Sequence, residues 1–407
     1  MDNPDPVVCI VGAGPAGLAL ARLLQRAHIT FVVFERQNAE GHRALTRAGM
    51  IEPRTVELLR PHGLADTILK RGARNGICEF RADGRAYILD YGRLTNGPGN
   101  YVYPQHELVD DWAEELHAAG GKINFGVRVT AIEQDAHGAT VTAIVEATEQ
   151  RTALRSEIVA VCSGAGTEPT IAGVNIATVE VSYPVRWIAV IASVSPTSQY
   201  TIYGLHRRGF AGQMRRSATM TRYYIEVSSA DSLDDWPDDR VWAELQERLG
   251  VAGQPSLLEG KLVERDILDL RAFVREPMQH GRVFLVGDAA HLVTPAGGKG
   301  MNMAIQDAVE LAAGLRDQYA GVGTGDRLAR YSATRLPVVW QYEEFSNFML
   351  SLLRADCTQV GQTSALGLDP QQGLDFGNNL REARLDRVLN DPPFSRWFAH
   401  VYSGVDP

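Results

Sequence analysis

The opening of the chain, from Val7 to Leu18, constrains its fold more than any other stretch. Its apolar run is typical of a buried parallel strand, and Gly12, Gly14 and Gly17 follow at the spacing of a dinucleotide-binding turn. In such a turn the first glycine allows the tight bend, the second lets a pyrophosphate approach the backbone, and the third lets helix and strand pack closely. The N–H groups and the positive dipole end of the helix then bind the anion.

A second strand and an acidic residue complete this pattern. We expect a helix over residues 18–26 and a strand over 29–34, which is followed by Glu35. A carboxylate at that place can accept hydrogen bonds from a ribose. The full order of strand, glycine turn, helix, strand and acid is more specific than three glycines alone, which can also form a purely structural turn. The sequence therefore predicts a Rossmann-like dinucleotide site and leaves open which dinucleotide it binds.

The composition is that of a globular protein of two or three domains, with 407 residues, 45% hydrophobic and 22% charged. Its net charge of −9 gives no support to binding of nucleic acid or of an anionic membrane. No apolar run reaches the roughly 18 residues of a membrane span, and no signal peptide precedes the first strand, so we expect a cytoplasmic protein. We find no histidine, cysteine and carboxylate cluster with metal spacing, so no metal is expected.

Periodicity predicts a nucleotide-binding domain that is interrupted by a second, mostly antiparallel sheet. We expect a loop over residues 36–46. The expected helices cover residues 53–59, 106–119, 242–249 and much of 302–353. The expected strands of the first domain cover residues 122–132, 140–146, 156–161 and 282–286. The second sheet is expected from residues 76–103 and 179–227, which alternate in polarity or are rich in β-branched and aromatic residues.

Further motifs follow in a fixed order and carry a resemblance. The strand at 282–286 leads into Gly287-Asp288-Ala289-Ala290-His291 and then into the segment 295–302, PAGGKGMN. With the opening glycines and Glu35, these motifs resemble the single-component, FAD-dependent aromatic hydroxylases, most closely the members that act on hydroxybenzoates. The similarity runs almost from end to end and includes residues 47–49, 102–105, 216–219, 222–224, 273–280 and 330–332.

The resemblance implies a mixed α/β fold with some α+β character. It implies a Rossmann-like FAD-binding domain formed by residues 1–75, 104–178 and 269–345. It places a substrate domain with an antiparallel sheet in residues 76–103 and 179–268, and a helical region in residues 346–407. Relatives of this type are commonly dimers, so a homodimer is expected.

For the flavin, the resemblance assigns FAD contacts to Arg47 and Gln105, and assigns Asp288 to the ribityl chain. The Asp288 carboxylate can bond sugar hydroxyls, although it can equally cap the helix that follows. Pro295 and the glycines after it leave exposed backbone that can approach a flat ring. The next helix, at Asn302, presents an N-terminus that stabilises the negative charge of a reduced flavin near its N1.

The resemblance also implies NADPH or NADH as electron donor. The matching cofactor-contacting positions are Arg36, Gln37 and Arg271. Two departures weaken the assignment of NADPH. An arginine of the closest relatives is replaced by Leu45, and their Asp-Gly pair and nearby histidine are replaced by Ser163-Gly164 and Gly166. We therefore predict a reduced nicotinamide without choosing between the two forms.

For the substrate, Arg216 and Arg222 have even spacing on an expected strand, which would direct both side chains to one face. Cations on a half-buried face need anions or aromatic rings nearby. By resemblance, Arg216 binds an aromatic carboxylate and Arg222 positions both flavin and substrate. Tyr203 bonds the substrate phenol, Tyr402 continues the proton relay, and Tyr224 is a further carboxylate contact.

This arrangement suits aromatic hydroxylation. A phenol attacks the terminal oxygen of a flavin C4a-hydroperoxide more readily as phenolate, so a base relay at the hydroxyl and an anchor at the opposite end orient the ortho carbon. Two departures affect this pocket. Met214 replaces the serine that binds the carboxylate, and Asn75 replaces the histidine at the solvent end of the relay and cannot titrate near neutral pH.

The sequence therefore predicts an FAD-dependent monooxygenase that adds one oxygen atom of O₂ to an aromatic acid with a hydroxyl or amino group. Two alternatives stay open. Met214 favours a tailoring hydroxylase of a larger, differently anchored phenol. Asn75, Ser163 and Gly166 favour a flavin-binding or ligand-sensing protein that has lost turnover.

Overall fold

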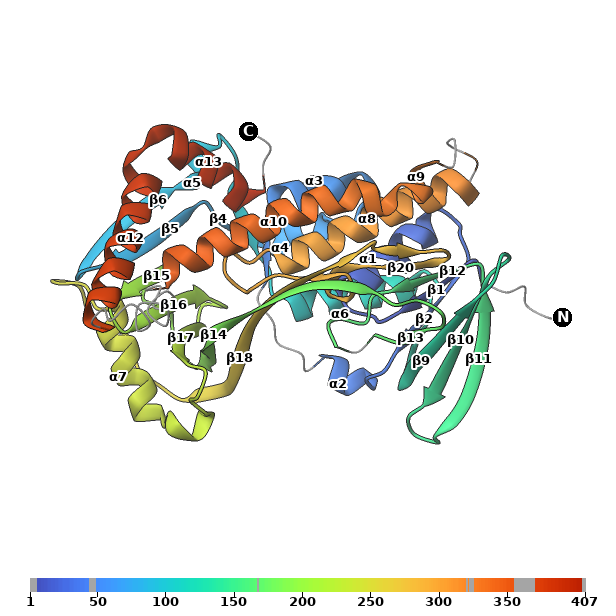
Figure 1. Ribbon diagram of the computed structural model, residues 1–407, viewed down its shortest axis with the longest axis horizontal. Coiled ribbons are helices and arrows are strands. Elements are labelled where there is room, and N and C mark those ends of the chain that lie inside the picture. The colour runs from blue at the N-terminus through green and yellow to red at the C-terminus, as the bar shows by residue number, and fades with distance from the viewer. Residues whose placement is uncertain are drawn as a thin grey trace. The chain divides into compact units, whose positions relative to one another are not determined.

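The computed structural model describes residues 6–43, 49–166, 168–319, 321, 326–354 and 370–404. The chain divides into two compact units, each assembled from three segments of the sequence. Unit 1 comprises Met1–Ala73, Tyr103–Glu180 and Ala272–Glu344. Unit 2 comprises Arg74–Val102, Val181–Arg271 and Phe345–Pro407. The colours of the ribbon follow the chain as it passes between the units (Figure 1).

Unit 1 is built on a six-stranded sheet with the order β19-β20-β12-β1-β2-β8. β1 (Val8–Val11) lies between β12 (Ile158–Val161) and β2 (Phe31–Glu35) and is parallel to both. The sheet continues with β8 (Ile123–Phe125), β20 (Val283–Leu285) and β19 (Gln279–His280). β1 and β12 are buried along their whole length, which explains their unbroken apolar sequences.

Helices of unit 1 pack beside this sheet. α1 (Pro15–Arg26) contacts both α8 (Gly300–Tyr319) and α6 (Gln105–Ala118). Unit 1 also contains α2 (Ala39–Arg43), α3 (Pro53–Leu59), η1 (Arg60–His62), α4 (Asp66–Arg71), η3 (Gly287–Ala289) and α9 (Asp326–Ala329). Unit 1 also has the short strands β3 (Met50–Ile51) and β21 (His291–Leu292).

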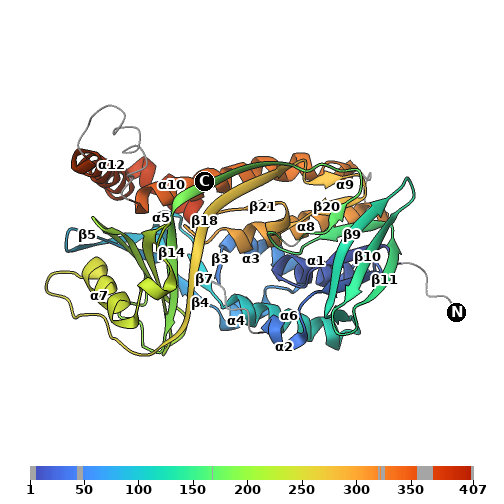
Figure 2. The same ribbon diagram turned by 60° about the horizontal axis from the view of Figure 1, so that its bottom comes forward.

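A second sheet of unit 1 has the order β11-β10-β9-β13. It consists of β11 (Gln150–Ser156), β10 (Ala139–Val145), β9 (Val127–Gln134) and β13 (Thr170–Ile171). β9, β10 and β11 lie side by side as an antiparallel meander (Figure 2). Their alternating burial shows that one face of this sheet is packed and the other is solvated.

Unit 2 is built on a mostly antiparallel sheet, in which the strand order is β18-β14-β17-β16-β15-β5-β6. The strands within unit 2 are β17 (Thr221–Ser228), β16 (Gly209–Arg215), β15 (Thr201–His206), β5 (Ile77–Ala82) and β6 (Arg85–Asp90). β14 (Ala177–Ala192) and β18 (Leu262–Glu276) are long strands with residues in both units. β15 and β5 form a parallel pair.

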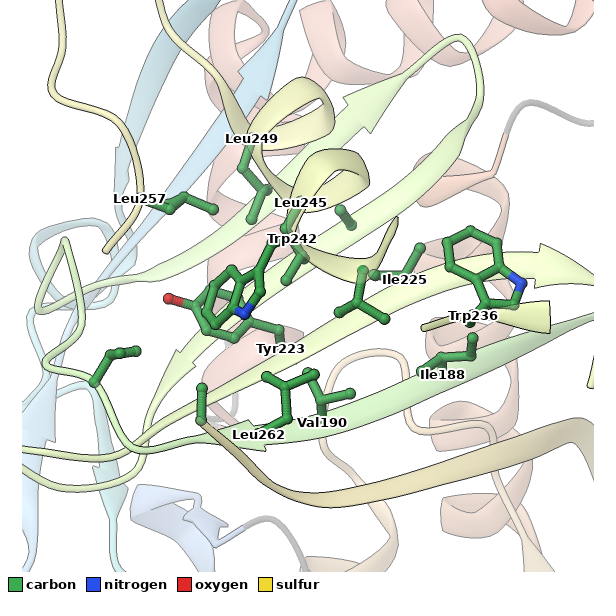
Figure 3. Close-up of a cluster of buried hydrophobic side chains, with 14 of the residues drawn as sticks. Ile188, Val190, Tyr223, Ile225, Trp236, Trp242, Leu245, Leu249, Leu257 and Leu262 are labelled. Carbon is green, nitrogen blue, oxygen red and sulfur yellow. The ribbon is translucent and has the colours of Figure 1, made fainter. Parts of the chain in front are cut away.

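One face of the unit 2 sheet packs against α7 (Asp238–Leu249). Trp242, Leu245 and Leu249 of the helix cover alternate residues of β14 and β17, including Val190 and Tyr223 (Figure 3). Tyr223 meets the edge of the Trp242 ring at a centroid distance of 5.5 Å. Because side chains alternate along a strand, the remaining residues of β14 and β17 point to the opposite face.

Helices complete unit 2. α12 (Pro370–Asn390) packs against α13 (Pro392–Ser403), which also contacts the short α5 (Tyr91–Leu94). α10 (Tyr331–Leu353) belongs to unit 1 up to Glu344 and to unit 2 beyond it. Within unit 2 the rings of Phe345 and Phe398 lie 5.6 Å apart, so aromatic contacts join α10 to α13. Unit 2 also contains β7 (Asn100–Val102) and η2 (Leu233–Asp235), and β4 (Ala73–Asn75) begins at its border.

The predicted mixed α/β fold is confirmed, and the helix expected over 53–59 is present with those bounds. Five local expectations are wrong. The strand expected over 122–132 is divided between β8 and β9, which belong to different sheets. The stretch 36–46 contains the helix α2 rather than only a loop, and residues 91–94 of an expected strand region form α5. α7 begins four residues earlier than expected, at Asp238, because acidic residues suit a first helical turn. The strand expected over 156–161 is divided between β11 and β12.

Among the described residues, no helix is both long and apolar enough to cross a bilayer.

Candidate functional site

The turn between β1 and α1 shows why its glycines differ in role. Gly12 has a φ of 107°, and a Cβ there would lie 2.5 Å from the carbonyl oxygen of Cys162. A Cβ on Gly17 would collide with the carbonyl oxygen of Gly12. Gly14 is different, because a Cβ on it would meet no atom within 4 Å. The open space at Gly14 lies at the N-terminus of α1, where a pyrophosphate can approach the backbone.

Glu35 ends β2 and is only 8% exposed. Its Oε2 accepts a hydrogen bond from the Ala13 N–H at 2.8 Å, and its Oε1 accepts one from the Gln37 N–H at 2.9 Å. Because each carboxylate oxygen has two lone pairs, both oxygens can still accept a bond from a ribose hydroxyl. Glu35 therefore holds the glycine turn in place and remains able to bind a sugar.

Asp288 is half-buried and lies in η3, which begins two residues after the end of β20. A Cβ on Gly287 would be 3.5 Å from the Cβ of Ala16, so this segment lies beside the start of α1. The arrangement brings Asp288 and the glycine turn to the same edge of the unit 1 sheet. Hydroxyl-rich chains of a dinucleotide fit a carboxylate placed next to a phosphate-binding turn.

The buried Asp307 of α8 fixes this segment in place. Its Oδ2 accepts the Gly287 N–H at 3.0 Å and lies 2.6 Å from His291 Nε2, and its Oδ1 accepts Arg335 Nε–H at 2.6 Å. Burial acts to raise the pKa of Asp307, but His291 and Arg335 hold the pKa below its ordinary value. The only sequence signal for Asp307 is a charged residue on the buried face of a predicted helix.

The segment from Pro295 to Lys299 forms the turn before α8. The Gly298 N–H donates to the Pro295 carbonyl at 3.2 Å, and Gly297 and Gly298 have positive φ values of 84° and 67°. The N–H groups of residues 300–302 precede the first α8 hydrogen bond, from Met303 to Lys299. Such a helix start stabilises negative charge, as on the pyrimidine side of a reduced flavin.

The Asn302 side chain supports this turn. Its Oδ1 accepts the Glu52 N–H at 2.9 Å, and its Nδ2 donates to the carbonyls of Met50 and Gly298. The side chain is fully buried. The Asn302 amide group is therefore fully used in holding β3 and the turn before α8 together.

A buried ion pair lies beneath the same turn. Lys299 Nζ is 2.6 Å from Glu52 Oε1, and the Tyr342 hydroxyl donates to Glu52 Oε2 at 2.7 Å. Burial lowers the pKa of Lys299, while Glu52 opposes that shift. Neither Glu52 nor Tyr342 belongs to a recognisable sequence motif, and only their long-range packing brings them to Lys299.

The structure places the other expected cofactor residues as follows. Gln105 is the first residue of α6 and is half-buried, and Arg36 follows β2 and is exposed. Gln37 donates its N–H to Glu35, and Arg271 is half-buried on β18. Gly164 and Gly166 have positive φ values of 84° and 75°. Arg47 and Leu45 lie outside the described residues.

In unit 2, the residues expected to bind substrate lie on the sheet face opposite α7. Met214 of β16 is directly paired with Arg222 of β17, and Gly212 is paired with both Tyr203 and Tyr224. Directly paired residues point to the same face, and Arg222 and Tyr224 share a face because they are two residues apart. The register therefore brings these side chains together.

The expectation that Arg216 and Arg222 share one strand is wrong. β16 ends at Arg215, and the Arg216 N–H donates to the Met220 carbonyl at 3.1 Å within the hairpin connection. Both guanidinium groups nevertheless act on Tyr224. Burial raises the pKa of Tyr224, and Arg222 and Arg216 oppose that rise. A turn, rather than strand alternation, brings Arg216 near Tyr224.

Arg222 is placed to bind an anion. Its Cζ is 5.4 Å from the centre of the Tyr224 ring. Its Nε is buried and has no hydrogen-bond partner among the described residues. A buried guanidinium N–H without an acceptor is costly, and a carboxylate would remove that cost. Met214 beside it is half-buried and can supply no hydroxyl.

Tyr203 and Tyr402 form a buried pair on the same face. Their hydroxyl oxygens lie 2.8 Å apart, and their side chains are 1% and 0% exposed. Burial raises the pKa of both hydroxyls well above the ordinary value. The Asn75 amide donates to Thr201 Oγ1 at 3.3 Å, and its backbone carbonyl accepts the Tyr91 hydroxyl. Asn75 therefore serves local structure in β4 and β15.

Further aromatic rings line this face and belong to no sequence motif. The Trp187 ring lies 5.5 Å from Tyr224 and 4.6 Å from Phe210, and Phe80 stacks on Tyr203 at 5.4 Å. Their sequence signal is the recurrence of aromatic residues within predicted strands. Register is needed to show that they share a face. Together with Tyr203 and Tyr224 they make this face of the sheet largely aromatic.

The family described as FAD binding domain matches residues 5–346. The chain is also 32% identical to p-hydroxybenzoate hydroxylase of Acinetobacter baylyi over 407 residues, which is 100% of this chain and 96% of that protein. The chain belongs to the FAD-dependent aromatic hydroxylases. It is a flavoprotein monooxygenase that uses FAD, with NADPH or NADH as electron donor.

Solved structures of other hydroxylases are also similar. Anhydrotetracycline hydroxylase from Streptomyces rimosus is 25% identical, with a TM-score of 0.74, and the match covers 99% of this chain and 76% of that one. p-Nitrophenol 4-monooxygenase from Pseudomonas putida has a TM-score of 0.77 at 21% identity, with 98% of each chain covered. The second likeness shows the fold of this hydroxylase family.

Proposed function

We propose that this flavoenzyme adds one oxygen atom of O₂ to an aromatic acid that carries a hydroxyl or amino group. One observation carries the proposal. One face of the unit 2 sheet, with the hairpin after β16, presents two cations near Tyr224 and the paired hydroxyls of Tyr203 and Tyr402. A flat molecule with an anion at one end and a hydrogen-bonding substituent at the other matches this arrangement.

The cationic end supports a carboxylate. The Arg222 Nε–H is buried and has no hydrogen-bond acceptor among the described residues. Arg216 lies close enough to lower the pKa of Tyr224. A carboxylate oxygen would satisfy the N–H group and neutralise the charge. Because Met214 offers no donor, the anchor would depend mainly on the arginines.

The tyrosine end supports proton transfer. Burial raises the pKa of Tyr203 and of Tyr402, so that both hydroxyls stay protonated near neutral pH. Neutral hydroxyls in hydrogen-bond contact can pass a proton along without storing charge. Tyr203 would accept the proton of the substrate hydroxyl while it gives its own to Tyr402, and Tyr402 would release its own proton to a water molecule. The ring would then be richer in electrons at the carbon that receives oxygen.

Unit 1 would hold the flavin. For the dinucleotide we propose Gly12, Gly14, Gly17, Glu35 and Asp288, and for the flavin ring the backbone from Pro295 to Asn302. Bound FAD supplies the oxygen-activating chemistry after reduction by NADPH or NADH. Further proposed cofactor contacts are Arg36, Gln37, Arg47, Gln105 and Arg271.

A second candidate is hydroxylation of a larger phenol. Met214 favours it, since a flexible thioether beside Arg222 offers an adaptable apolar contact instead of a donor. Anhydrotetracycline hydroxylase, which has a similar structure, is named for a larger acceptor, and this is consistent with such a substrate.

Oxidation of NADPH and NADH should be measured with a panel of hydroxy- and aminobenzoates and larger phenols, with products identified by mass. We expect a hydroxylated benzoate. Activity on larger phenols alone would favour the second candidate. Flavin binding without substrate-stimulated oxidation would favour a protein without turnover. Light scattering should test the proposed homodimer.

A further inference from the structure

The side chains opposite α7 form a row across the unit 2 sheet that lacks one member. The register pairs Phe80 with Tyr203, Tyr203 with Gly212, and Gly212 with Tyr224. The row thus consists of aromatic rings with a gap at Gly212. Two strand spacings, about 10 Å, separate the backbones of Tyr203 and Tyr224. A single-ring hydroxy acid is short enough to span that separation.

Phe210 partly occupies this gap. It precedes Gly212 by two residues on β16, so both positions share a face. A Cβ on Gly212 would be 2.7 Å from the Phe210 Cζ, which shows that the ring leans along the strand toward Gly212. The ring is fully buried and contacts Trp187 at a centroid distance of 4.6 Å and Tyr203 at 6.3 Å.

The backbone does not require glycine at this position. Gly212 is absent from the residues with positive φ, so its conformation is open to other amino acids. Space is the constraint, because a side chain would compete with the Phe210 ring. Phe210 and Gly212 therefore act as a pair, in which the small residue provides room for the large one.

We propose that Phe210 and Gly212 together set the size of the aromatic acceptor. The inference rests on the proposed function, which places the acid between Tyr203 and the arginines. With the Phe210 ring beside Gly212, the space between Tyr203 and Tyr224 would be limited to one aromatic ring. A fused second ring would need the volume that Phe210 occupies. Phe210 is thus a specificity-determining residue that selects single-ring acids.

The test compares 4-hydroxybenzoate with 6-hydroxy-2-naphthoate in the holoenzyme. For each variant, kcat/KM is measured from product formation, and Kd from the change in flavin fluorescence. Phe210→Leu should raise the naphthoate-to-benzoate ratio by about tenfold or more, the usual effect of a change in pocket volume. Adding Gly212→Ala to Phe210→Leu should refill the gap and return the ratio toward the wild-type value.

Val190→Ala is the matched control, because Val190 lies on the same sheet but faces α7. It should lower thermal stability without changing the ratio. An unchanged ratio in an active Phe210→Leu enzyme overturns the size filter and leaves the hydroxylase assignment intact. If wild type binds both acids without turnover, the Kd ratios still decide the filter, while the proposed function fails.

Gly212→Ala alone covers the case in which Phe210→Leu does not fold. The added methyl group must displace the Phe210 ring, so kcat/KM for 4-hydroxybenzoate should fall by about tenfold. If kcat/KM equals the wild-type value, Phe210 and Gly212 do not act together to limit the space. A wild type that binds neither acid overturns both the filter and the proposed function.

Discussion

The hydroxyl groups of Tyr203 and Tyr402 lie 2.8 Å apart although 199 positions separate the residues in the chain. One is on β15 and the other on α13, and both belong to unit 2. The pair is fully enclosed, so a proton that reaches Tyr203 has Tyr402 as its hydrogen-bonded neighbour. The proposed proton transfer would therefore run from the substrate through Tyr203 to Tyr402.

Tyr402→Phe should therefore slow hydroxylation. The variant keeps the ring that stacks on Phe398 but removes the hydroxyl that bonds Tyr203. Loss of a general acid or base typically costs about a hundredfold in rate or more. The measurement is the rate of product formation, together with the product formed per NAD(P)H consumed. Tyr331→Phe is a suitable control because it removes an equally buried hydroxyl, bonded to the Leu285 carbonyl in unit 1. Equal coupling in wild type and Tyr402→Phe would contradict the relay.

Two glycines of the opening turn should respond differently to substitution. Gly14 has φ and ψ of −70° and −172°, and a Cβ there points into open space, so Gly14→Val should fold. Its side chain would occupy the space proposed for the pyrophosphate, and FAD should bind at least about tenfold more weakly. Gly17→Ala should instead destabilise the protein, because its Cβ collides with the Gly12 carbonyl. Flavin absorbance and thermal unfolding of the apoprotein separate these effects. Normal FAD content in Gly14→Val would show that the space is unused.

Arg216→Ala should weaken binding of the acid. A charge-assisted hydrogen bond contributes about 1.5–3 kcal/mol, so KM for the best acid should rise by roughly ten- to a hundredfold. Arg215→Ala provides the matched control, since Arg215 is the adjacent arginine and is exposed. Steady-state kinetics of both variants should be compared with an aromatic acid and with the corresponding neutral amide. An equal rise in KM for the acid and the amide would show that Arg216 does not bind the substrate carboxylate.

Met214→Ser should tighten the same acid by restoring a hydroxyl opposite Arg222. The expected gain is about 1 kcal/mol, or roughly fivefold in Kd. Fluorescence titration of the flavin with 4-hydroxybenzoate measures it. An unchanged Kd would mean that the methionine only fills space, and a weaker one would favour a substrate that contacts the thioether.

Glu226 should make stability depend on pH. Burial raises the pKa of Glu226 from 4.5 to about 7, while Arg354, Arg248 and Arg381 oppose the rise. Because the folded pKa is higher than the unfolded one, the contribution of Glu226 to stability is present below pH 4.5 and is lost as the pH rises through about 7. Glu226→Gln should thus stabilise the protein at pH 8 by up to about 3 kcal/mol, with little effect at pH 4.5. Denaturant unfolding at both pH values measures this.

Glu79→Gln is the contrasting variant for Glu226→Gln. Glu79 is similarly buried on the same sheet, but its Oε1 lies 2.7 Å from Arg81 Nε. Removing this partner leaves a buried guanidinium without its counter-charge, so the variant should be less stable by about 3 kcal/mol. If Glu226→Gln were destabilised at pH 8 to the same extent, the arginines near Glu226 would hold it ionised.

The sequence by itself determined the features that depend on neighbours in the chain. The turn at Gly12 to Gly17 needs a strand before it and a helix after it, and these constraints lie within a few residues. The helix of residues 53–59 is set equally locally, by a proline at its start and apolar residues along one side. Glu35 follows from the same motif, because the end of β2 must reach the glycine turn of its parallel neighbour.

Only the tertiary structure decided which distant side chains share a face. Strand alternation predicts which residues of a strand point to the same face, but not where the strand ends. The hairpin that separates Arg216 from Arg222 therefore could not be predicted. The gap at Gly212 requires the register of several strands, and register arises from burial of the α7 face rather than from any one segment. The contacts of Asp307 and of Glu52 likewise form only when packing brings helices and loops of remote sequence together, since burying a charge is tolerated only with its partner in place.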